Sequence, residues 1–554
     1  MDHYQNEEYI SDLTDRIFLI KQELEAGKLK IASHLMDDFV SSFEKVRLRD
    51  DGKVDPLTVD GRIRVMGAAV NHFVEREKTK NNHSIIDLQK AYFDILFTNF
   101  GEVFTAMTNS GAEPYKVSGF FSQKADYVQH LYEVFPDLFA QVKEFWEAAS
   151  AIGVIHLQDG TQLKANFSGD LFPSYSENAV STAGLYVDTI SLPCPILRAG
   201  RLHRTADKAE FTRVLLKHVL TCMTYRDIAL EEIEPAIVLI LPDRRDFAEN
   251  NHEQLIAACE PYVLAHAQYL YDRKFENYDE FRDFSKTLVD IEAVLKNLKR
   301  PERLIFDTEW GAEQQLTKLL SDKGRLSRRV VGDHAGMEVF LNSSGRMPQA
   351  YSAKRNAQEL GSTPYINAET SWIYYTWLIE YESKNFNVDD AELKNLHMMH
   401  ALSSGMQDGF SWLGNVPIDK IIELRRNNLM EEVRNVLSNG VDRLVHSSAD
   451  NYTETTQQVI DNIDRAFIEH QRVIAKAKKE KLRIYGLDVL PCIANGAIAI
   501  AGALTGNVAL GTLSAGLGIM GLSSITDIKS KFKERQERLN IYQASVTGIL
   551  FSHK

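Results

Sequence analysis

The chain has 554 residues, of which 44% are hydrophobic and 25% charged, so it can bury several cores, and roughly two to four domains are expected. Its net charge of −14 excludes a general nucleic-acid binder, because binding to phosphates requires a basic face and none occurs before residue 472. The four cysteines lie far apart without a CxxC pair, which predicts neither a disulfide framework nor a zinc ribbon.

The first residues are acidic and polar, which is not typical of a secretory signal or a transit peptide. Before residue 489, no window of the sequence is apolar enough to span a bilayer. Together with the sparse cysteines, these features predict a cytoplasmic protein. Any membrane association is expected to be peripheral or reversible and to involve only the C-terminal segment.

Residues 1–150 are predicted to form a helical N-terminal region. Ile10, Leu13, Ile17 and Ile20 recur at helical spacing, and a second helix is expected from Ser84, which caps a run of apolar residues. Breaks are expected where glycine, proline, aspartate and serine cluster, at 50–60 and 109–119.

Residues 151–340 are predicted to form a small α/β domain. Residues 154–157 and 162–167 flank Asp159 and Gly160, the pattern of a β-hairpin with a type I′ turn. Further strands are expected at 185–190, 236–241 and 303–307, with helices at 206–232, 250–272 and 278–299. These elements predict a small mixed or parallel sheet with helices on its faces.

The rest of the chain is predicted to be helical. Residues 341–366 are turn-rich and are expected to form a loop or a domain boundary, and residues 367–487 a helical region. One long helix is expected at 453–485, ending at Gly486, and residues 488–554 form an apolar helical hairpin with a basic tail. The predicted fold class is therefore a predominantly α-helical, multidomain α+β protein.

The predicted hairpin contains no charged residue between Asp488 and Asp527 and has Gly506-Asn507 near its middle. Its flanks are basic, which is the pattern of a hairpin that enters a membrane from its cytoplasmic side. Small residues at helical spacing within it permit close helix packing. The candidate membrane-binding residues are Lys476, Lys478, Lys479, Lys481, Gly502, Gly506, Gly511, Lys529, Lys531 and Lys533.

Each predicted arm is short for a bilayer and contains few strongly apolar residues, so one arm alone is close to neutral toward lipid. We therefore expect reversible insertion rather than a permanent anchor. The alternative is that the two arms form a tightly packed pair buried under the other helices of the protein.

Charged residues follow one of the predicted strands and lie within another. The strand at 236–241 precedes Asp243, Arg244, Arg245 and Asp246, and the strand at 185–190 contains Asp188. In parallel neighbouring strands these side chains would approach one another, as carboxylates that hold Mg²⁺ and arginines that bind phosphate do. They are the candidate catalytic residues, and the alternative is a salt-bridged surface turn. The sequence names no cofactor.

His397 and His400 lie on one face of a predicted helix, but no third ligand at a known spacing accompanies them, so a packing role is favoured over a metal site. The sequence has no GxxxxGK[ST], GxSxG or HExxH motif and no GxGxxG after a strand, which argues against the corresponding enzyme classes.

Three functions follow as hypotheses. The leading one is a regulated intracellular protein whose hairpin engages or inserts into an anionic membrane; this layout resembles toxin-like or cell-defence effectors in which an apolar hairpin is hidden until triggered. The alternatives are a soluble metal- or phosphate-dependent enzyme and a non-catalytic helical scaffold. A second copy or another protein is the other expected partner, and nucleic acid is not.

Overall fold

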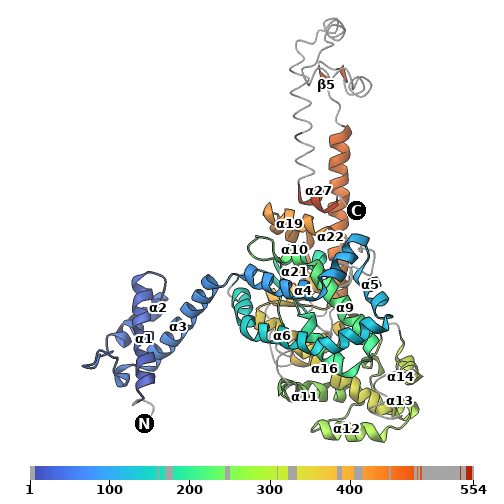
Figure 1. The fold of residues 1–554 in the computed structure, drawn as a ribbon, viewed down its shortest axis with the longest axis horizontal. Helices are drawn as coiled ribbons and strands as arrows, with labels where there is room; N and C mark the ends of the chain where they lie inside the picture. Colours follow the sequence, from blue (N-terminus) through green and yellow to red (C-terminus); the bar gives the residue numbers. More distant parts are fainter. Residues whose placement is uncertain are drawn as a thin grey trace. The chain divides into compact units, whose positions relative to one another are not determined.

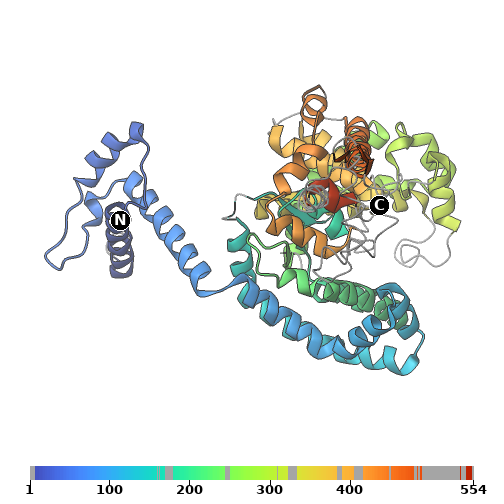
Figure 2. The ribbon, with the colours of Figure 1, turned by 90° about the horizontal axis from the view of Figure 1, so that it is seen from above.

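The computed structural model (Figure 1; Figure 2) describes the following residues: 6–158, 160, 162–168, 179–243, 250–307, 310–321, 334–383, 390–404, 416–447, 451–479, 483–484, 487–488, 537 and 545–551. Its contacts divide the chain into two units, residues Met1–Ala91 with Ala148–Asp159 and residues Tyr92–Glu147 with Gly160–Lys554. The protein is predominantly α-helical with a small parallel sheet, which confirms the predicted fold class.

The first unit is built mainly from three helices and one short 3₁₀ helix: α1 (Glu7–Glu25), α2 (Ser33–Phe43), η2 (Pro56–Thr58) and α3 (Gly61–Asn82). Helix α1 packs against α3. The apolar positions Leu13, Ile17 and Ile20 of α1 are buried in one core with Ile63 and Val70 of α3, as their helical spacing predicts.

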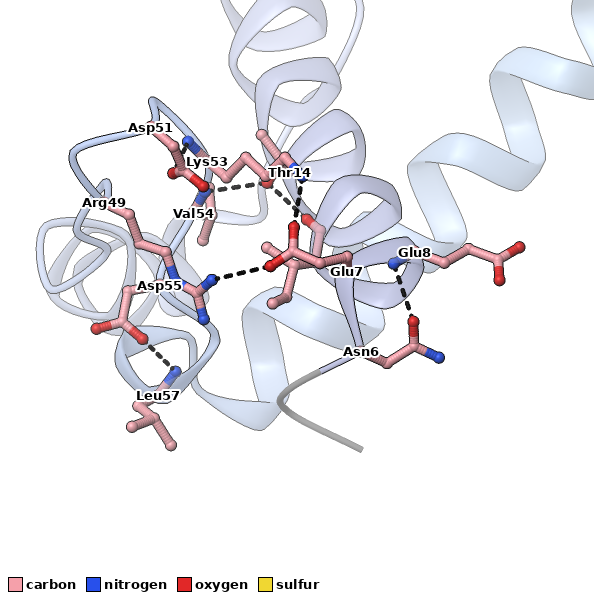
Figure 3. A network of polar contacts seen from close by, with 11 residues as sticks. Asn6, Glu7, Glu8, Thr14, Arg49, Asp51, Lys53, Val54, Asp55 and Leu57 are labelled. Carbon is pink, nitrogen blue, oxygen red and sulfur yellow. Dashed lines mark hydrogen bonds and ion pairs between the residues drawn. The ribbon is translucent and has the colours of Figure 1, made fainter. Parts of the chain in front are cut away.

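A polar network fixes the start of α1 (Figure 3). Asn6 caps the helix by accepting a hydrogen bond from the Glu8 amide at 2.9 Å. Glu7 forms an ion pair with Lys53 at 2.7 Å, and the Thr14 hydroxyl accepts a hydrogen bond from the Val54 amide at 3.0 Å. The loop between α2 and α3 is thereby tied to α1.

The second unit holds the remaining elements, and α4 and α6 contribute residues to both units. Its helices up to residue 271 are α4 (Ile85–Ser110), α5 (Pro114–Phe121), α6 (Ala125–Gln158), α7 (Ala179–Gly184), α8 (Pro195–Thr205), α9 (Lys208–Thr224), α10 (Arg226–Ala229) and α11 (Asn250–Tyr271). They are followed by α12 (Tyr278–Thr287), α13 (Ile291–Asn297), η4 (Pro301–Arg303), α14 (Ala312–Ser321), α16 (Ala335–Leu360) and α17 (Glu369–Ser383).

A four-stranded parallel sheet lies in this unit, made of β1 (Lys164–Phe167), β2 (Thr189–Leu192), β3 (Val238–Ile240) and β4 (Thr363–Tyr365). The spatial order is β3-β2-β1-β4. The strands β2 and β3 follow one another on one side of β1, and β4 is added on the other side of β1. All four strands are buried, which agrees with the expectation of a parallel sheet covered by helices.

The predicted hairpin at 154–167 is wrong. Residues 154–157 complete helix α6, whose Leu157 is buried, and residues 164–167 form β1, which pairs in parallel with β2 and β4. A run of four residues of which three are apolar fits a helix end as well as a strand, so this short pattern could not distinguish the two.

The predicted loop at 341–366 is also wrong, because α16 runs from Ala335 to Leu360 and β4 follows it. The Ser343 hydroxyl, a turn former in the sequence, instead donates a hydrogen bond to the Val339 carbonyl within the helix at 2.9 Å. Burial against α11, α12 and α17 outweighs the turn-forming composition. The helix stops at Gly361, whose φ of 57° is left-handed.

The strand expected at 303–307 is absent from the described residues 301–307. Pro301–Arg303 forms η4, and the following backbone groups bond to side chains: the Gln315 side chain accepts from the amides of Phe306 at 2.8 Å and Asp307 at 3.1 Å. These bonds occupy groups that a strand would use for pairing.

The C-terminal helices are α18 (Asp390–Ser404), α19 (Ile418–Arg426), α20 (Met430–Leu437), α21 (Val441–Ser447), α22 (Tyr452–Lys479) and α27 (Val546–Phe551). A long helix is present where one was expected at 453–485, but its predicted end at Gly486 is wrong: α22 ends at Lys479, before the short antiparallel pair β5 (Arg483–Ile484) and β6 (Leu487–Asp488). The apolar hairpin at 489–526 lies outside the described residues.

An aromatic core joins α11, α16 and α17, and it contains a buried histidine, His266 of α11. The His266 ring stacks on Trp377 with 5.3 Å between ring centroids, and its Nδ1 lies 3.0 Å from the Tyr381 hydroxyl. Its Nε2 is buried without a hydrogen-bond partner. Burial, and to a smaller extent Arg303, lowers the pKa of His266 to about 3.

This neutral histidine predicts acid sensitivity. Because the folded-state pKa lies below the usual 6.5, the stability it contributes is complete above pH 6.5 and is lost as the pH falls toward 3. Between pH 7.5 and 5.5 we expect a loss of about 1.4 kcal/mol in the free energy of unfolding from this one group. Urea denaturation of His266→Phe should show that much less pH dependence than the native chain, whereas His130→Gln, at an exposed histidine, should not.

Candidate functional site

The structure places the two described candidate carboxylates at opposite ends of the parallel strands. Asp188 comes directly before β2, at the edge where the strands begin, and Asp243 follows β3, at the edge where they end. The parallel register aligns Ile190 with Val238, so the strands do not bring the two carboxylates together. The expected convergence is therefore wrong for this pair, because the predicted strand at 185–190 was placed too early in the chain.

Asp188 binds two arginines from the C-terminal helices. Arg425 of α19 and Arg434 of α20 both contact its Oδ1, and the Leu163 amide donates a hydrogen bond to its Oδ2 at 3.0 Å. The same arginines donate to the carbonyls before it, Arg425 to Val187 and Arg434 to Tyr186, the latter at 2.6 Å. We call this group the Asp188 cluster.

The Asp188 cluster is largely shielded from solvent, with Arg425 buried and Asp188 and Arg434 partly buried. Burial acts to raise the pKa of Asp188, but the positive charges of Arg425 and Arg434 and their hydrogen bonds outweigh it, so the pKa lies below its ordinary value. Burial lowers the pKa of Arg425, which Asp188 counteracts. The carboxylate is thus held ionised between two guanidinium groups, which is the arrangement of a structural clamp rather than of a general acid or base.

Asp243 forms a second buried pair at the other edge of the sheet. Its Oδ2 lies 3.1 Å from Nη2 of Arg198, which is in the first turns of α8 after β2, and both side chains are at most 3% exposed. Asn356 of α16 donates a hydrogen bond to the same oxygen. His218 of α9 lies near Arg198. Burial first, and then the charges of Lys217 and Arg198, lower the pKa of His218 to about 3.

The other candidate catalytic residues, Arg244, Arg245 and Asp246, lie outside the described residues. Of the candidate membrane-binding residues, Lys476 is exposed near the end of α22. Lys478 and Lys479 belong to the same helix, although their side chains are outside the description. The rest, Lys481, Gly502, Gly506, Gly511, Lys529, Lys531 and Lys533, also lie outside it.

The helices that precede and follow the apolar segment, α22 and α27, pack against each other. The chain leaves by α22 and returns as α27, which packs against α22 and α19 and lies beside α22 in both views (Figure 1; Figure 2). Val546 and Ile549 of α27 are buried, at 1% and 2% exposure. The intervening residues therefore begin and end on one helical platform.

His397 and His400 are both packed against neighbouring helices, as the sequence favoured. Within the described part of the chain, no group of three histidine, cysteine, aspartate or glutamate side chains is arranged to hold a metal ion. His397 bonds to Thr455 of α22, with Nδ1 3.0 Å from its hydroxyl, and His400 stacks on Trp372 of α17 with 4.2 Å between ring centroids.

No family model, curated protein or solved structure matches this chain. Among the described helices, none combines the length and the apolar composition that a bilayer crossing requires. The candidate sites are therefore assessed from their own geometry.

The partners of both carboxylates were missed by sequence reasoning. Arg198, Asn356, Arg425 and Arg434 carry no local motif, and Arg425 is separated from Asp188 by more than two hundred residues. Only a signal of spatial contact between distant positions, such as paired substitutions among relatives, could have indicated them.

The Asp188 cluster predicts a large effect of substitution. Asp188→Ala leaves the buried Arg425 guanidinium without its carboxylate, so we expect the free energy of unfolding to fall by about 3–5 kcal/mol. Asp442→Ala is the matched control, because Asp442 also pairs with a lysine of a neighbouring helix, Lys394, but is 59% exposed. The control should cost less than about 1 kcal/mol. Urea denaturation measures both, and equal effects would contradict the clamp.

The pair at the other edge predicts non-additive substitutions. Asp243→Leu alone leaves the Arg198 charge buried and should lower the free energy of unfolding by about 3–5 kcal/mol. The double variant Arg198→Met, Asp243→Leu removes both charges and should recover most of that loss. A double-mutant cycle by urea denaturation checks this, and additive losses would show that the two side chains do not act as a pair.

Proposed function

We propose that this protein binds an anionic membrane through the apolar segment 489–526, which enters the bilayer as a hairpin from a platform formed by α19, α22 and α27. The observation that carries the proposal is the packing of α27 against α22. Because this packing holds α22, which precedes the segment, and α27, which follows it, on one platform, the proposed hairpin leaves from and returns to the same side of a membrane.

The charges beside the segment support this orientation. Lys476 is exposed near the end of α22, and the sequence adds Lys478, Lys479, Lys481 and Arg483 before the segment and Lys529, Lys531 and Lys533 after it. A lysine or arginine near an anionic leaflet contributes about 1 kcal/mol of binding free energy. The basic residues therefore favour a surface rich in acidic phospholipids, although the whole chain is acidic.

The composition of the segment favours insertion of both arms together. Each arm alone is close to neutral toward hydrocarbon, since glycine, alanine and a proline dilute the strongly apolar residues. The small residues at helical spacing, such as Gly502 and Gly506, allow the two arms to pack closely, so that each arm buries part of its surface against the other. Reversible binding follows, rather than a permanent anchor.

The geometry disfavours the enzyme hypothesis and leaves the hypothesis of a protein-binding scaffold open. An enzyme centred on Asp188 and Asp243 together is disfavoured, because the carboxylates lie at opposite edges of the sheet and each is engaged by arginine. Binding of a second copy or another protein stays a prediction. Large apolar side chains that are exposed in the first unit, including Phe18, Leu35, Met36, Val40, Leu57, Val65 and Phe73, favour it.

Flotation with vesicles tests the membrane proposal. The full chain is mixed at pH 7.5 and at pH 5.5 with vesicles of phosphatidylcholine alone or with added phosphatidylserine. We expect flotation with the anionic vesicles at one or both pH values. Replacing residues 489–526 by a glycine–serine linker should abolish it, because the linker supplies no apolar surface while α27 can still pack against α22.

Two controls sharpen this experiment. The linker variant must keep the far-ultraviolet circular dichroism of its helices, which shows that the platform is intact. Exchange of Lys476, Lys478, Lys479 and Lys481 for glutamine should weaken binding by roughly 4 kcal/mol if each contributes fully. Absence of flotation at both pH values, or flotation that persists without the segment, contradicts the proposal.

A further inference from the structure

Two histidines lie where α18 meets the start of α22, the helix that leads into the apolar segment. The His397 ring stacks on Tyr452 with 4.0 Å between centroids, and its Nδ1 lies 3.0 Å from the Thr455 hydroxyl. His397 and Thr455 are both completely buried. About two helical turns further along α18, the Ser404 hydroxyl lies 3.4 Å from that of Thr456. Imidazole and hydroxyl groups thus hold the first turns of α22.

His400 occupies the same joint and contacts two helices. Its ring lies flat on Trp372 of α17, at 4.2 Å between centroids and an interplanar angle of 6°, and meets the Tyr452 ring edge-on at 5.6 Å. Its Nδ1 is buried and has no hydrogen-bond partner. The neutral His400 ring therefore packs here as an aromatic group, and its Nδ1 is buried against protein without a hydrogen bond.

We propose that His400, supported by His397, is an acid-sensitive latch: protonation of His400 releases the first turns of α22 and so frees the platform that carries the apolar segment. The inference rests on the proposed function, to which it adds the trigger.

The neighbours of His400 disfavour a positive charge. A protonated ring would carry an Nδ1–H with no acceptor, three residues from His397 and beside the first turn of α22, where the helix dipole is positive. Among the residues that the structure describes, Tyr452 of α22 meets His400 edge-on, and Tyr375 of α17 stacks on Trp372. Glu382 and Glu392 are near Tyr375, whose pKa burial raises first and these carboxylates raise further.

The balance of these groups sets the direction of the response. Burial, and then His397, lowers the pKa of His400 from 6.5 to about 4. A histidine with a lowered pKa stabilises the closed joint fully above pH 6.5 and progressively less as the pH falls toward 4. With an ordinary pKa in the open state, the opening equilibrium constant increases about tenfold between pH 7.5 and pH 5.5.

Hydrogen exchange of the full chain, followed by mass spectrometry of peptides from 452–470, measures opening without a membrane. After correction for the intrinsic pH dependence of exchange, we expect about tenfold more opening at pH 5.5 than at pH 7.5. His400→Phe keeps a ring on Trp372 but does not titrate, so it should lose this increase. His400→Gln is a second non-titrating variant if the phenylalanine disturbs folding, and His130→Gln, at an exposed site, should respond like the native chain.

Vesicle flotation of the same proteins separates the latch from the membrane function. The latch predicts more flotation of the native chain at pH 5.5 than at pH 7.5, and a reduced difference in His400→Phe. Opening of α22 without flotation at either pH supports the latch and overturns the membrane function. Equal flotation at both pH values without added opening supports the membrane function and overturns the latch, as does an acid response that both non-titrating variants retain.

Discussion

The carboxylate of Asp188 is the contact on which the arrangement of the second unit depends. It stands at the start of β2, is tied to the start of β1 through the Leu163 amide, and accepts from arginines of α19 and α20. A single charge therefore joins the sheet to helices from the far end of the chain. Since one partner, Arg425, is almost completely buried, either group alone would be a charge in an apolar interior.

The clamp connects the sheet to the platform of the apolar segment. Helix α19 contacts α27, and α20 contacts α22, so the helices that hold Asp188 also contact the two helices that precede and follow the segment. At the opposite edge of the sheet, the pair of Arg198 and Asp243 fixes α8 relative to the chain that follows β3. The sheet is short, and ion pairs at both ends of its strands connect it to the helices around it.

The fold class, the long helix α22 and two of the strands could be predicted from the sequence because they depend on local periodicity. The helical spacing of Leu13, Ile17 and Ile20 is visible without knowing their partners. Helix α16 could not be predicted, since its serines and Pro348 signal turns and only burial in the aromatic core makes them helical. The clamp could not be predicted for a related reason. Asp188 could be identified as a carboxylate beside a strand, but its two arginines lie on helices that are distant in sequence and contact it only in the folded protein.

The packing of α27 against α22 and α19 has a kinetic consequence. It makes the residues between Lys479 and Ser545 a tethered loop, so in the membrane binding that we propose, the arrival of one arm of the apolar segment at a bilayer holds the other close by at a high effective concentration. Entry of the second arm is then a unimolecular step that requires no second encounter. Two arms that are each nearly indifferent to lipid can in this way act as one cooperative unit, and any number of crossings they make is even.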